Sequence, residues 1–226
     1  MKHLIISCTK KERSNTILFR SLTALQDIIE LKKLVEPEIK FEFIENNTRG
    51  LSKNYNECIE KYKDKYDSLV FIHDDVELTK PNFLRQLENA YDYFDIVGLA
   101  GCLDPEIKRP ILWHLMSSEL NRRGRVGHVM NNEKFITDFG PSNCRVCIID
   151  GLFMAFKTES IKKSGFRLDE SFDFHHYDTS VGLIANELKL KVGVWDIPVY
   201  HLSPGLFDYN NLAFQISQDK FLEKYG

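Results

Sequence analysis

The sequence predicts an α/β fold with a mostly parallel central sheet, in a chain of 226 residues that we expect to form one domain. Short apolar runs alternate with stretches of helical periodicity through the first half, and polar residues follow each apolar run. The expected elements are a strand at 3–8, a helix at 17–34, a strand at 41–45, a helix at 51–62, a strand at 68–73 and a helix from Pro81. This alternation is typical of parallel βαβ units.

The helices of the first half are predicted from the spacing of their apolar residues. Between 17 and 34 these residues recur with a helical period, and Ser14 or Asn15 suits the cap before them. Between 51 and 62 the apolar residues also share one helical face. Pro81 suits the first position of the third helix, because an N–H at that position would have no partner within the helix.

The second half of the chain has a less regular pattern. The expected elements are a strand at 95–102, a strand at 147–156 that Asp150 and Gly151 interrupt, a helix at 158–164, an aromatic and acidic loop at 172–178, a helix at 179–188 and a strand at 191–197. Residues 104–143 are polar and mixed in pattern, so they can be assigned to neither helix nor strand.

Composition and charge exclude several classes of protein. The net charge of −3 and the pI near 6.2 do not mark a nucleic-acid binder. No segment approaches the roughly 20 apolar residues that a membrane span needs. The N-terminal apolar run is too short for a secretory signal. We therefore expect a cytoplasmic protein.

The five cysteines argue against a disulfide scaffold, because their number is odd. Cys144 and Cys147 form one C-x-x-C pair, but no second ligand pair lies at a spacing that suits structural zinc. Both residues stand at the entrance of an apolar run. Buried or nearly buried thiols are therefore favoured over a zinc or redox site.

Polar residues follow the first three expected strands. Thr9 to Glu12 follow the first strand, Glu45 to Asn47 end the second, and His73, Asp74 and Asp75 end the third. The carboxyl ends of parallel strands share one edge of the sheet, and ligands bind beyond that edge. The topology alone therefore predicts a site where these three groups meet.

The adjacent carboxylates Asp74 and Asp75 are the candidate metal-binding group. Two neighbouring carboxylates repel each other, which favours a bound cation or a shared proton. Hard divalent ions such as Mg²⁺ commonly take one or two carboxylates together with phosphate oxygens. A solvated acidic turn is the alternative, and the position at the end of a buried strand favours the metal.

Five segments in order resemble the motifs of the GT-A glycosyltransferases, in particular the inverting family 2 type. They are His73-Asp74-Asp75 before Pro81, the helix start at 50–59 with Asn56 and Ile59, the run DGLFMAF at 150–156, the segment His176-Tyr177-Asp178, and the closing segment 198–205 with His201. His73 stands where the family usually has the first acid of its D-x-D motif. Tyr177 replaces the Glu of an E-D pair. The resemblance is weakest between 104 and 143.

The resemblance implies a GT-A (Rossmann-like) fold, a three-layer α/β/α sandwich with a mostly parallel central sheet. Residues 1–103 would then bind the nucleotide-sugar and residues 104–226 the acceptor. It implies that Asp178 is the catalytic base and that Asp75 and His201 hold Mn²⁺ or Mg²⁺. The residues expected to bind the donor are Thr9, Glu12, Glu45, Asn56, His73 and Asp74.

The implied reaction is a metal-dependent, inverting transfer of a sugar from a nucleoside-diphosphate sugar, with a UDP-sugar expected first. The acceptor would be a hydroxyl of a glycan or of a lipid-linked molecule, in the synthesis of a surface polysaccharide. A lipid-linked acceptor would place the protein at the inner face of the membrane, peripherally bound. No nucleic-acid partner is expected, and the sequence leaves the oligomeric state open.

Two other enzyme classes share parts of this pattern. A nucleotidyltransferase would show a glycine-rich basic loop after the first strand, where this chain has Thr9-Lys10-Lys11 without glycine. A metal-dependent hydrolase could use histidines such as His175, His176 and His201, but no closely spaced ligand motif such as H-E-x-x-H is present. Trp113 and His114 could line an acceptor groove, although a buried tryptophan is favoured.

Overall fold

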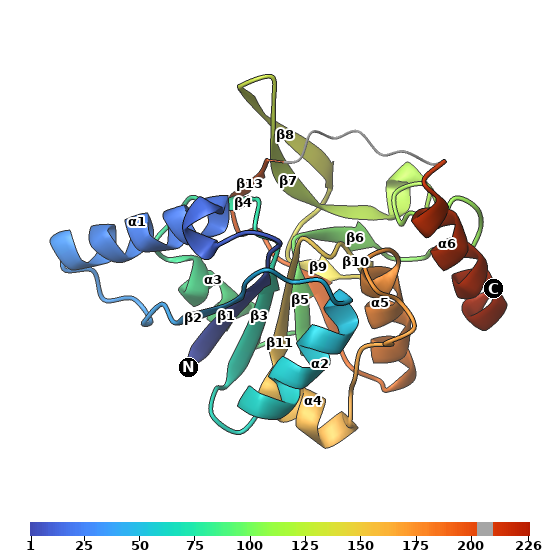
Figure 1. Cartoon of the computed structure of the whole chain (residues 1–226), viewed down its shortest axis with the longest axis horizontal. Coiled ribbons are helices and arrows are strands. Elements are labelled where there is room, and N and C mark those ends of the chain that lie inside the picture. Colours follow the sequence, from blue (N-terminus) through green and yellow to red (C-terminus); the bar gives the residue numbers. More distant parts are fainter. Residues whose placement is uncertain (203–209) are drawn as a thin grey trace.

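The expected alternation of strands and helices is present in the first half of the computed structural model, which describes residues 1–202 and 210–226 (Figure 1). Its elements are β1 (His3–Cys8), α1 (Ile17–Leu31), β2 (Phe41–Ile44), α2 (Leu51–Tyr62), β3 (Ser68–Ile72), β4 (Val76–Leu78) and α3 (Phe83–Ala90). Helix α1 ends three residues before the predicted position 34. Lys33 has a φ of 50°, and this left-handed backbone ends the helix.

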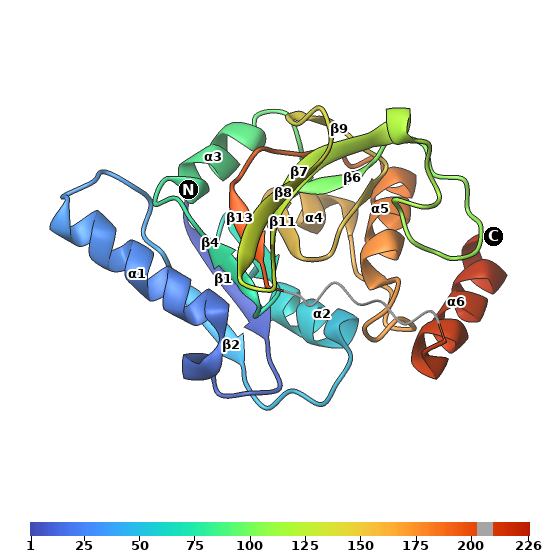
Figure 2. The ribbon, with the colours of Figure 1, turned by 90° about the horizontal axis from the view of Figure 1, so that it is seen from above.

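The central sheet has seven strands in the order β2-β1-β3-β11-β5-β12-β9. The strands of the second half are β5 (Ile96–Gly98), β9 (Cys144–Arg145), β11 (Phe153–Lys157) and β12 (Val192–Val194). Strands β2, β1, β3, β5 and β12 run in one direction, whereas β11 and β9 oppose them. Helices α1 and α2 lie on opposite sides of β1 (Figure 2), so the expected layering with a mostly parallel sheet is confirmed.

A second sheet of six strands was not predicted. It has the order β10-β6-β7-β13-β4, with β8 paired to β7. Its further strands are β6 (Ala100–Cys102), β7 (Arg122–Met130), β8 (Glu133–Gly140), β10 (Ile148–Ile149) and β13 (Val199–His201). The predicted strand at 95–102 is therefore wrong as one unit, because β5 belongs to the first sheet and β6 to the second.

The predicted strand at 147–156 also divides between the two sheets. Strand β10 pairs with β6, and β11 pairs with β3 and β5. Asp150 and Gly151 lie at the crossing between them. The two sheets approach closely here, since a Cβ on Gly98 of β5 would lie 2.8 Å from the Cβ of Ile149 in β10. The interruption seen in the sequence is thus the point where the chain changes sheets.

The segment that sequence patterns left unassigned contains a long hairpin of β7 and β8, which extends away from the rest of the molecule (Figure 1). Asn131 and Asn132 form its two-residue turn with φ values of 52° and 65°. Positive φ at both turn residues suits the right-handed twist of the flanking strands, and asparagine tolerates it. The Asn-Asn pair is therefore a hairpin signal that the sequence offered.

The helices that complete the fold are α4 (Thr158–Ser164), α5 (Tyr177–Glu187) and α6 (Leu212–Tyr225). Two helix starts differ from prediction. Helix α3 begins at Phe83, because Pro81 belongs to the preceding turn. Helix α5 begins at Tyr177, since His176 before it adopts a left-handed backbone with φ of 66°. Asp178 therefore lies within the first turn of a helix rather than in a loop.

None of the described helices is both long and apolar enough to cross a lipid bilayer.

Helix α5 packs directly on β10 through Gly182. A Cβ at this position would lie 2.4 Å from the carbonyl oxygen of Cys147, and the Asn186 side chain donates to the same oxygen at 2.9 Å. Replacing glycine inside a helix by alanine normally stabilises a protein by up to about 1 kcal/mol. The close backbone contact removes that gain here, so Gly182 fixes how near α5 comes to the sheets.

We expect Gly182→Ala to lower the free energy of unfolding by about 1–3 kcal/mol, because the added methyl overpacks the helix against β10. Urea unfolding followed by circular dichroism measures this change. Glu187→Ala in the same helix is the control, and its exposed side chain predicts a change within about 0.5 kcal/mol. A Gly182→Ala protein that is more stable than the wild type would contradict this packing.

Candidate functional site

The polar ends of β1, β2 and β3 meet at one edge of the central sheet, as the topology predicts. The Thr9 hydroxyl donates to the Asp74 carboxylate at 2.5 Å, which joins the ends of β1 and β3. The backbone N–H of Asn47 donates to the carbonyl oxygen of Thr9 at 2.8 Å, which joins the ends of β1 and β2. Thr9 thus holds Asp74 in a fixed position beside the second strand end.

Glu12 and Glu45 lie at the same edge and differ in their contacts. The Glu45 carboxylate accepts from the backbone N–H of Arg13 at 2.5 Å and fixes the short 3₁₀ turn Arg13–Asn15. Glu12 is exposed and makes no capping hydrogen bond to that turn. The structure therefore places both carboxylates near the strand ends, with Glu45 held and Glu12 open to solvent.

Asn56 differs from the other expected donor-binding residues because it has a structural position. Its side-chain amide donates to the carbonyl oxygen of Leu168 at 2.9 Å, and its oxygen accepts from the Leu168 N–H at 2.9 Å. The same amide also donates to Glu170 at 2.9 Å. Through these contacts the buried amide holds the loop after α4 against α2, away from the strand ends.

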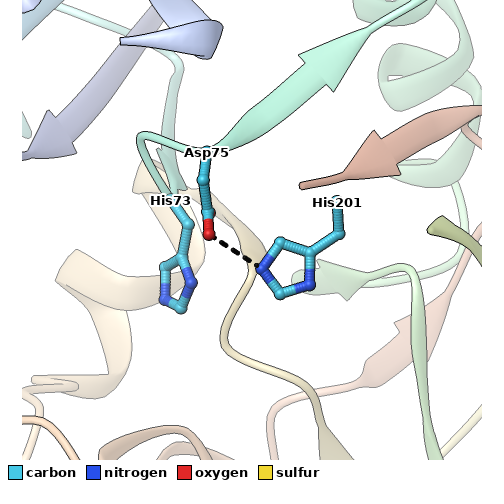
Figure 3. A group of neighbouring side chains, drawn as sticks. All are labelled: His73, Asp75 and His201. Atoms are coloured by element: carbon cyan, nitrogen blue, oxygen red, sulfur yellow. Dashed lines mark ion pairs between the residues drawn. The ribbon is translucent and has the colours of Figure 1, made fainter. Parts of the chain in front are cut away.

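Three side chains from two separate parts of the chain converge beside this edge: His73, Asp75 and His201 (Figure 3). His73 and Asp75 follow β3, whereas His201 ends β13 of the second sheet. The Asp75 carboxylate lies 3.3 Å from Nε2 of His201. Strand β13 pairs with β4 in a register that sets His201 opposite Val76. The pairing of two strands far apart in sequence thus builds the cluster.

Within this cluster Asp75 and His201 each favour the charged form of the other. Burial alone raises the pKa of Asp75, but the hydrogen bond and positive charge of His201 outweigh it and lower that pKa. Burial likewise lowers the pKa of His201, and the bond to Asp75 reverses the effect and raises it. Burial lowers the pKa of His73, so this ring is held neutral. The cluster contains one carboxylate and two imidazoles.

The donor set fits a divalent cation. One atom from each of the three residues can be chosen so that all lie within 4.8 Å of one another. The second carboxylate oxygen of Asp75, Oδ1, is buried and has no hydrogen-bond partner in the described part of the chain. A buried carboxylate oxygen without a partner is costly, and a cation would satisfy it.

Asp178 lies in the first turn of α5 and faces the crossing between the two sheets. Its carboxylate accepts from the backbone N–H of Gly151 at 3.0 Å and from that of Thr179 at 2.8 Å. A side chain on Gly151 would clash, because its Cβ would lie 2.9 Å from the Cβ of Asp178. The glycine therefore allows the helix and the crossing to come close enough for this hydrogen bond.

Burial and the negative charge of Asp150 raise the pKa of the Asp178 carboxyl to about 7. Asp150 is itself held in place, since the Trp113 indole N–H donates to it at 3.0 Å and the Leu152 N–H donates to it at 3.0 Å. Two carboxyl groups thus share one confined region. A group with a pKa near the ambient pH can both take up and release a proton.

A pocket of about 170 Å³ is lined by this carboxyl pair and by His73 of the histidine cluster. Its wall contains His73 and the segments 111–114, 150–151 and 174–179, together with Phe214. Trp113 is only 4% exposed, as favoured from the sequence, while its indole N–H still reaches the pocket through Asp150. The base candidate and one histidine of the cluster therefore open onto the same space.

Helix α6 holds the segments that line this pocket. The buried Gln218 side chain accepts from the Ile111 N–H at 2.9 Å. Ser217 lies 2.7 Å from Nδ1 of His176 and donates to the carbonyl oxygen of His175 at 2.9 Å. These contacts hold His175 and His176 against α6.

Cys144 and Cys147 are free and half-buried. Neither belongs to the cluster of potential metal ligands found within residues 1–202 and 210–226.

A model of the "Glycosyltransferase like family" matches residues 6–223. The chain belongs to this family. The match covers nearly the whole sequence, so the expectation of a sugar-transferring enzyme is confirmed at the level of the family. A search of curated proteins finds no match.

Solved structures support the GT-A fold of this family member. The crystal structure of A197 from STIV has a TM-score of 0.54 at 11% identity, covering 90% of this chain and 86% of that one. The catalytic domain of Drosophila beta1,4-galactosyltransferase 7, solved with xylobiose, has a TM-score of 0.53 at 10% identity, covering 100% of this chain and 81% of that one. At these identities the likeness concerns the fold, and the expected GT-A architecture is confirmed.

Three residues of this glycosyltransferase-like site lie in motifs of the resemblance but were not predicted as site residues: Asp150, Gly151 and Tyr177. The first two appear in the sequence as an Asp-Gly interruption of an apolar run. This interruption predicts a bend in the chain, but it does not show which residues Asp150 and Gly151 contact. The Tyr177 hydroxyl lies 2.8 Å from Nε2 of His73 and donates to the Gly151 carbonyl oxygen at 3.0 Å. The closing motif is only partly visible, since residues 203–205 lie outside the described residues.

We expect Asp150→Asn to lower the pKa of Asp178, because it removes the neighbouring negative charge. Burial is the larger cause of the shift, so the pKa should stay above the ordinary carboxyl value of 3.8. In the wild type, Asp178 is protonated below about pH 7 and charged above it. Titration of side-chain carboxyl carbons by NMR measures both midpoints. Asp196→Asn, at the ion pair with Arg125, is the control and should leave the midpoint unchanged.

Proposed function

We propose that the protein is a metal-dependent inverting glycosyltransferase that moves a sugar from a nucleoside-diphosphate sugar to a hydroxyl group of a glycan or lipid-linked acceptor. The observation that carries this proposal is the shared pocket. Asp178, a carboxyl whose pKa is raised to about 7, and His73, beside Asp75 and His201, line the same space. Sugar transfer needs a proton acceptor and a stabilised diphosphate within reach of one another.

Asp75 and His201 are the proposed ligands of the divalent cation, Mn²⁺ or Mg²⁺. A cation held there stabilises the negative charge that forms on the departing diphosphate. The orphan Oδ1 of Asp75 supports this assignment, because the protein keeps a buried acceptor without its own donor. Strand β13 brings His201 to that carboxylate from the second sheet.

The nucleotide part of the donor is proposed to bind along the ends of β1, β2 and β3. The hydrogen bond from Thr9 orients Asp74, and the bond from the Arg13 N–H orients Glu45. Oriented carboxylates beyond parallel strands suit the hydroxyl groups of a ribose. Glu12 is exposed at the same edge and is proposed as a further contact. We do not extend this proposal to Asn56, since both the nitrogen and the oxygen of its side-chain amide bind the backbone of Leu168.

Asp178 is the proposed base. The charged form takes the proton of the acceptor hydroxyl as the hydroxyl oxygen attacks the anomeric carbon, and the bond from that carbon to the diphosphate breaks. Attack from the face opposite to the departing diphosphate inverts the anomeric configuration. The two backbone N–H groups that donate to Asp178 fix its direction toward the pocket. A base near its own pKa suits proton removal at neutral pH.

The acceptor is proposed to enter beside Trp113 and His114. The 111–114 segment lines the pocket opposite the start of α5. A UDP-sugar is the donor tested first, and a surface polysaccharide is the proposed destination of the sugar. A lipid-linked acceptor would place the protein at the cytoplasmic face of a membrane.

The donor is identified by incubating the protein with a panel of nucleotide-sugars and Mn²⁺ and following release of the nucleoside diphosphate. We expect release from one donor class, loss of release after chelation with EDTA, and recovery when Mn²⁺ is added back. The recovery is the control for damage by the chelator. No release from any donor, with or without metal, would refute the proposed function.

We expect Asp178→Asn to lower kcat by about 10²–10⁴-fold, since the amide cannot accept the acceptor's proton. Donor affinity, measured by calorimetry, should stay within about twofold because the base does not hold the nucleotide. Asp173→Asn, an exposed carboxylate in the preceding loop, is the matched control and should keep its activity. Loss of donor binding in Asp178→Asn would assign this carboxylate to the donor site.

A further inference from the structure

His73 and Tyr177 each stand where the family motif that this chain resembles has an acid, and in the structure their side chains touch. Nε2 of His73 lies 2.8 Å from the Tyr177 hydroxyl. The two residues are 104 positions apart, so the fold itself brings them together. A histidine in place of an acid is thus accompanied by a hydroxyl that can bind it.

The hydrogen bonds of Tyr177 decide which nitrogen of His73 carries the proton. A phenol has a single proton, and the Gly151 carbonyl oxygen, 3.0 Å away, can only accept. Both contacts are satisfied together when Tyr177 donates to Gly151 and accepts from the Nε2–H of His73. The other nitrogen of the ring, Nδ1, then has a free electron pair.

The His73 ring is also fixed in orientation. It stacks on Phe174 with ring centroids 6.4 Å apart and on Tyr177 at 6.5 Å. Its backbone N–H donates to the Leu152 carbonyl oxygen at 3.0 Å. Because Nε2 is used by Tyr177, Nδ1 is the atom that His73 can offer to the cluster with Asp75 and His201.

We infer that Tyr177 is a positioning residue that fixes the tautomer of His73 and so makes His73 the third protein ligand of the cation, through Nδ1. This inference rests on the proposed function, in which the cluster binds a divalent cation. It replaces the expectation that His73 contacts the donor directly. Metal-binding histidines are commonly oriented by a second hydrogen bond of this kind.

A site with two imidazoles and one carboxylate differs in metal preference from a pair of acids. Mg²⁺ strongly prefers oxygen ligands, whereas imidazole nitrogen suits first-row transition metals. The cluster of His73, Asp75 and His201 has one carboxylate, and Asp74, which accepts from the Thr9 hydroxyl, is not part of it. The geometry therefore favours Mn²⁺ or Co²⁺ over Mg²⁺.

Metal binding and the tautomer of His73 are measured directly, without donor or acceptor. Binding of Mn²⁺ is followed by the loss of its free EPR signal, and Mg²⁺ is added as a competitor. The tautomer of the apoprotein is read from ¹⁵N–¹H correlation spectra of the histidine rings. The variants are Tyr177→Phe, which removes the hydroxyl, and His73→Asp, which restores an acid. Tyr55→Phe is the matched control, because its ring packs edge-on against Tyr177 at 6.1 Å.

We expect the wild type to bind Mn²⁺ at least tenfold more tightly than Mg²⁺ and to show the Nε2–H form of His73. Tyr177→Phe should mix the two tautomers and weaken Mn²⁺ binding by about 10–100-fold. His73→Asp should reduce the preference for Mn²⁺ over Mg²⁺, and Tyr55→Phe should match the wild type.

Unchanged Mn²⁺ affinity and tautomer in Tyr177→Phe would overturn the inference, as would a wild type that binds both ions equally. Failure of the proposed function is distinguishable from this result. If the metal and tautomer results follow expectation and no nucleotide-sugar is turned over, the metal site stands and the transferase proposal falls.

Discussion

The backbone of Gly151 is the point on which the rest of the site depends. Its N–H donates to the carboxylate of Asp178, and its carbonyl oxygen accepts from the hydroxyl of Tyr177. One residue therefore fixes the base candidate and, through Tyr177, the ring of His73. It can do so because residue 151 lacks a side chain and lies where the chain crosses between the two sheets. The helix start, the crossing and the histidine cluster form one connected arrangement.

Several costly features are concentrated around Gly151. His176 adopts a left-handed backbone just before α5, Asp178 is a carboxyl whose pKa burial raises, and a buried oxygen of Asp75 has no partner in the described chain. Each of these features costs stability, and none is needed to pack a core. Their clustering at one pocket distinguishes it from the larger groove beside Tyr200, where Arg125 and Asp196 already neutralise each other.

Periodicity and strand endings were enough to predict the β1–β3 unit and the edge at which Thr9, Glu45 and Asp74 lie. These features are local, so a single sequence contains them. The second sheet could not be predicted, because Leu99 lies inside an apolar run that is typical of one continuous strand. The interruption at Asp150 does not show that the residues before and after it belong to different sheets. His201 was placed correctly beside Asp75 only through the resemblance. The contact of Tyr177 with His73 depends on how α5 packs through Gly182, which no local pattern encodes.

The order of strands in the central sheet also governs how the protein folds. Strand β11 lies between β3 and β5 although it follows them by more than fifty residues, and β12 then pairs with β5 from still further along the chain. Closing such long loops is entropically slow compared with forming the neighbouring β1–α1–β2–α2–β3 contacts. During synthesis, the N-terminal strands can therefore assemble while β3 still has an open edge. The pocket can form only after α5 has left the ribosome, so it appears later than the edge formed by β1, β2 and β3.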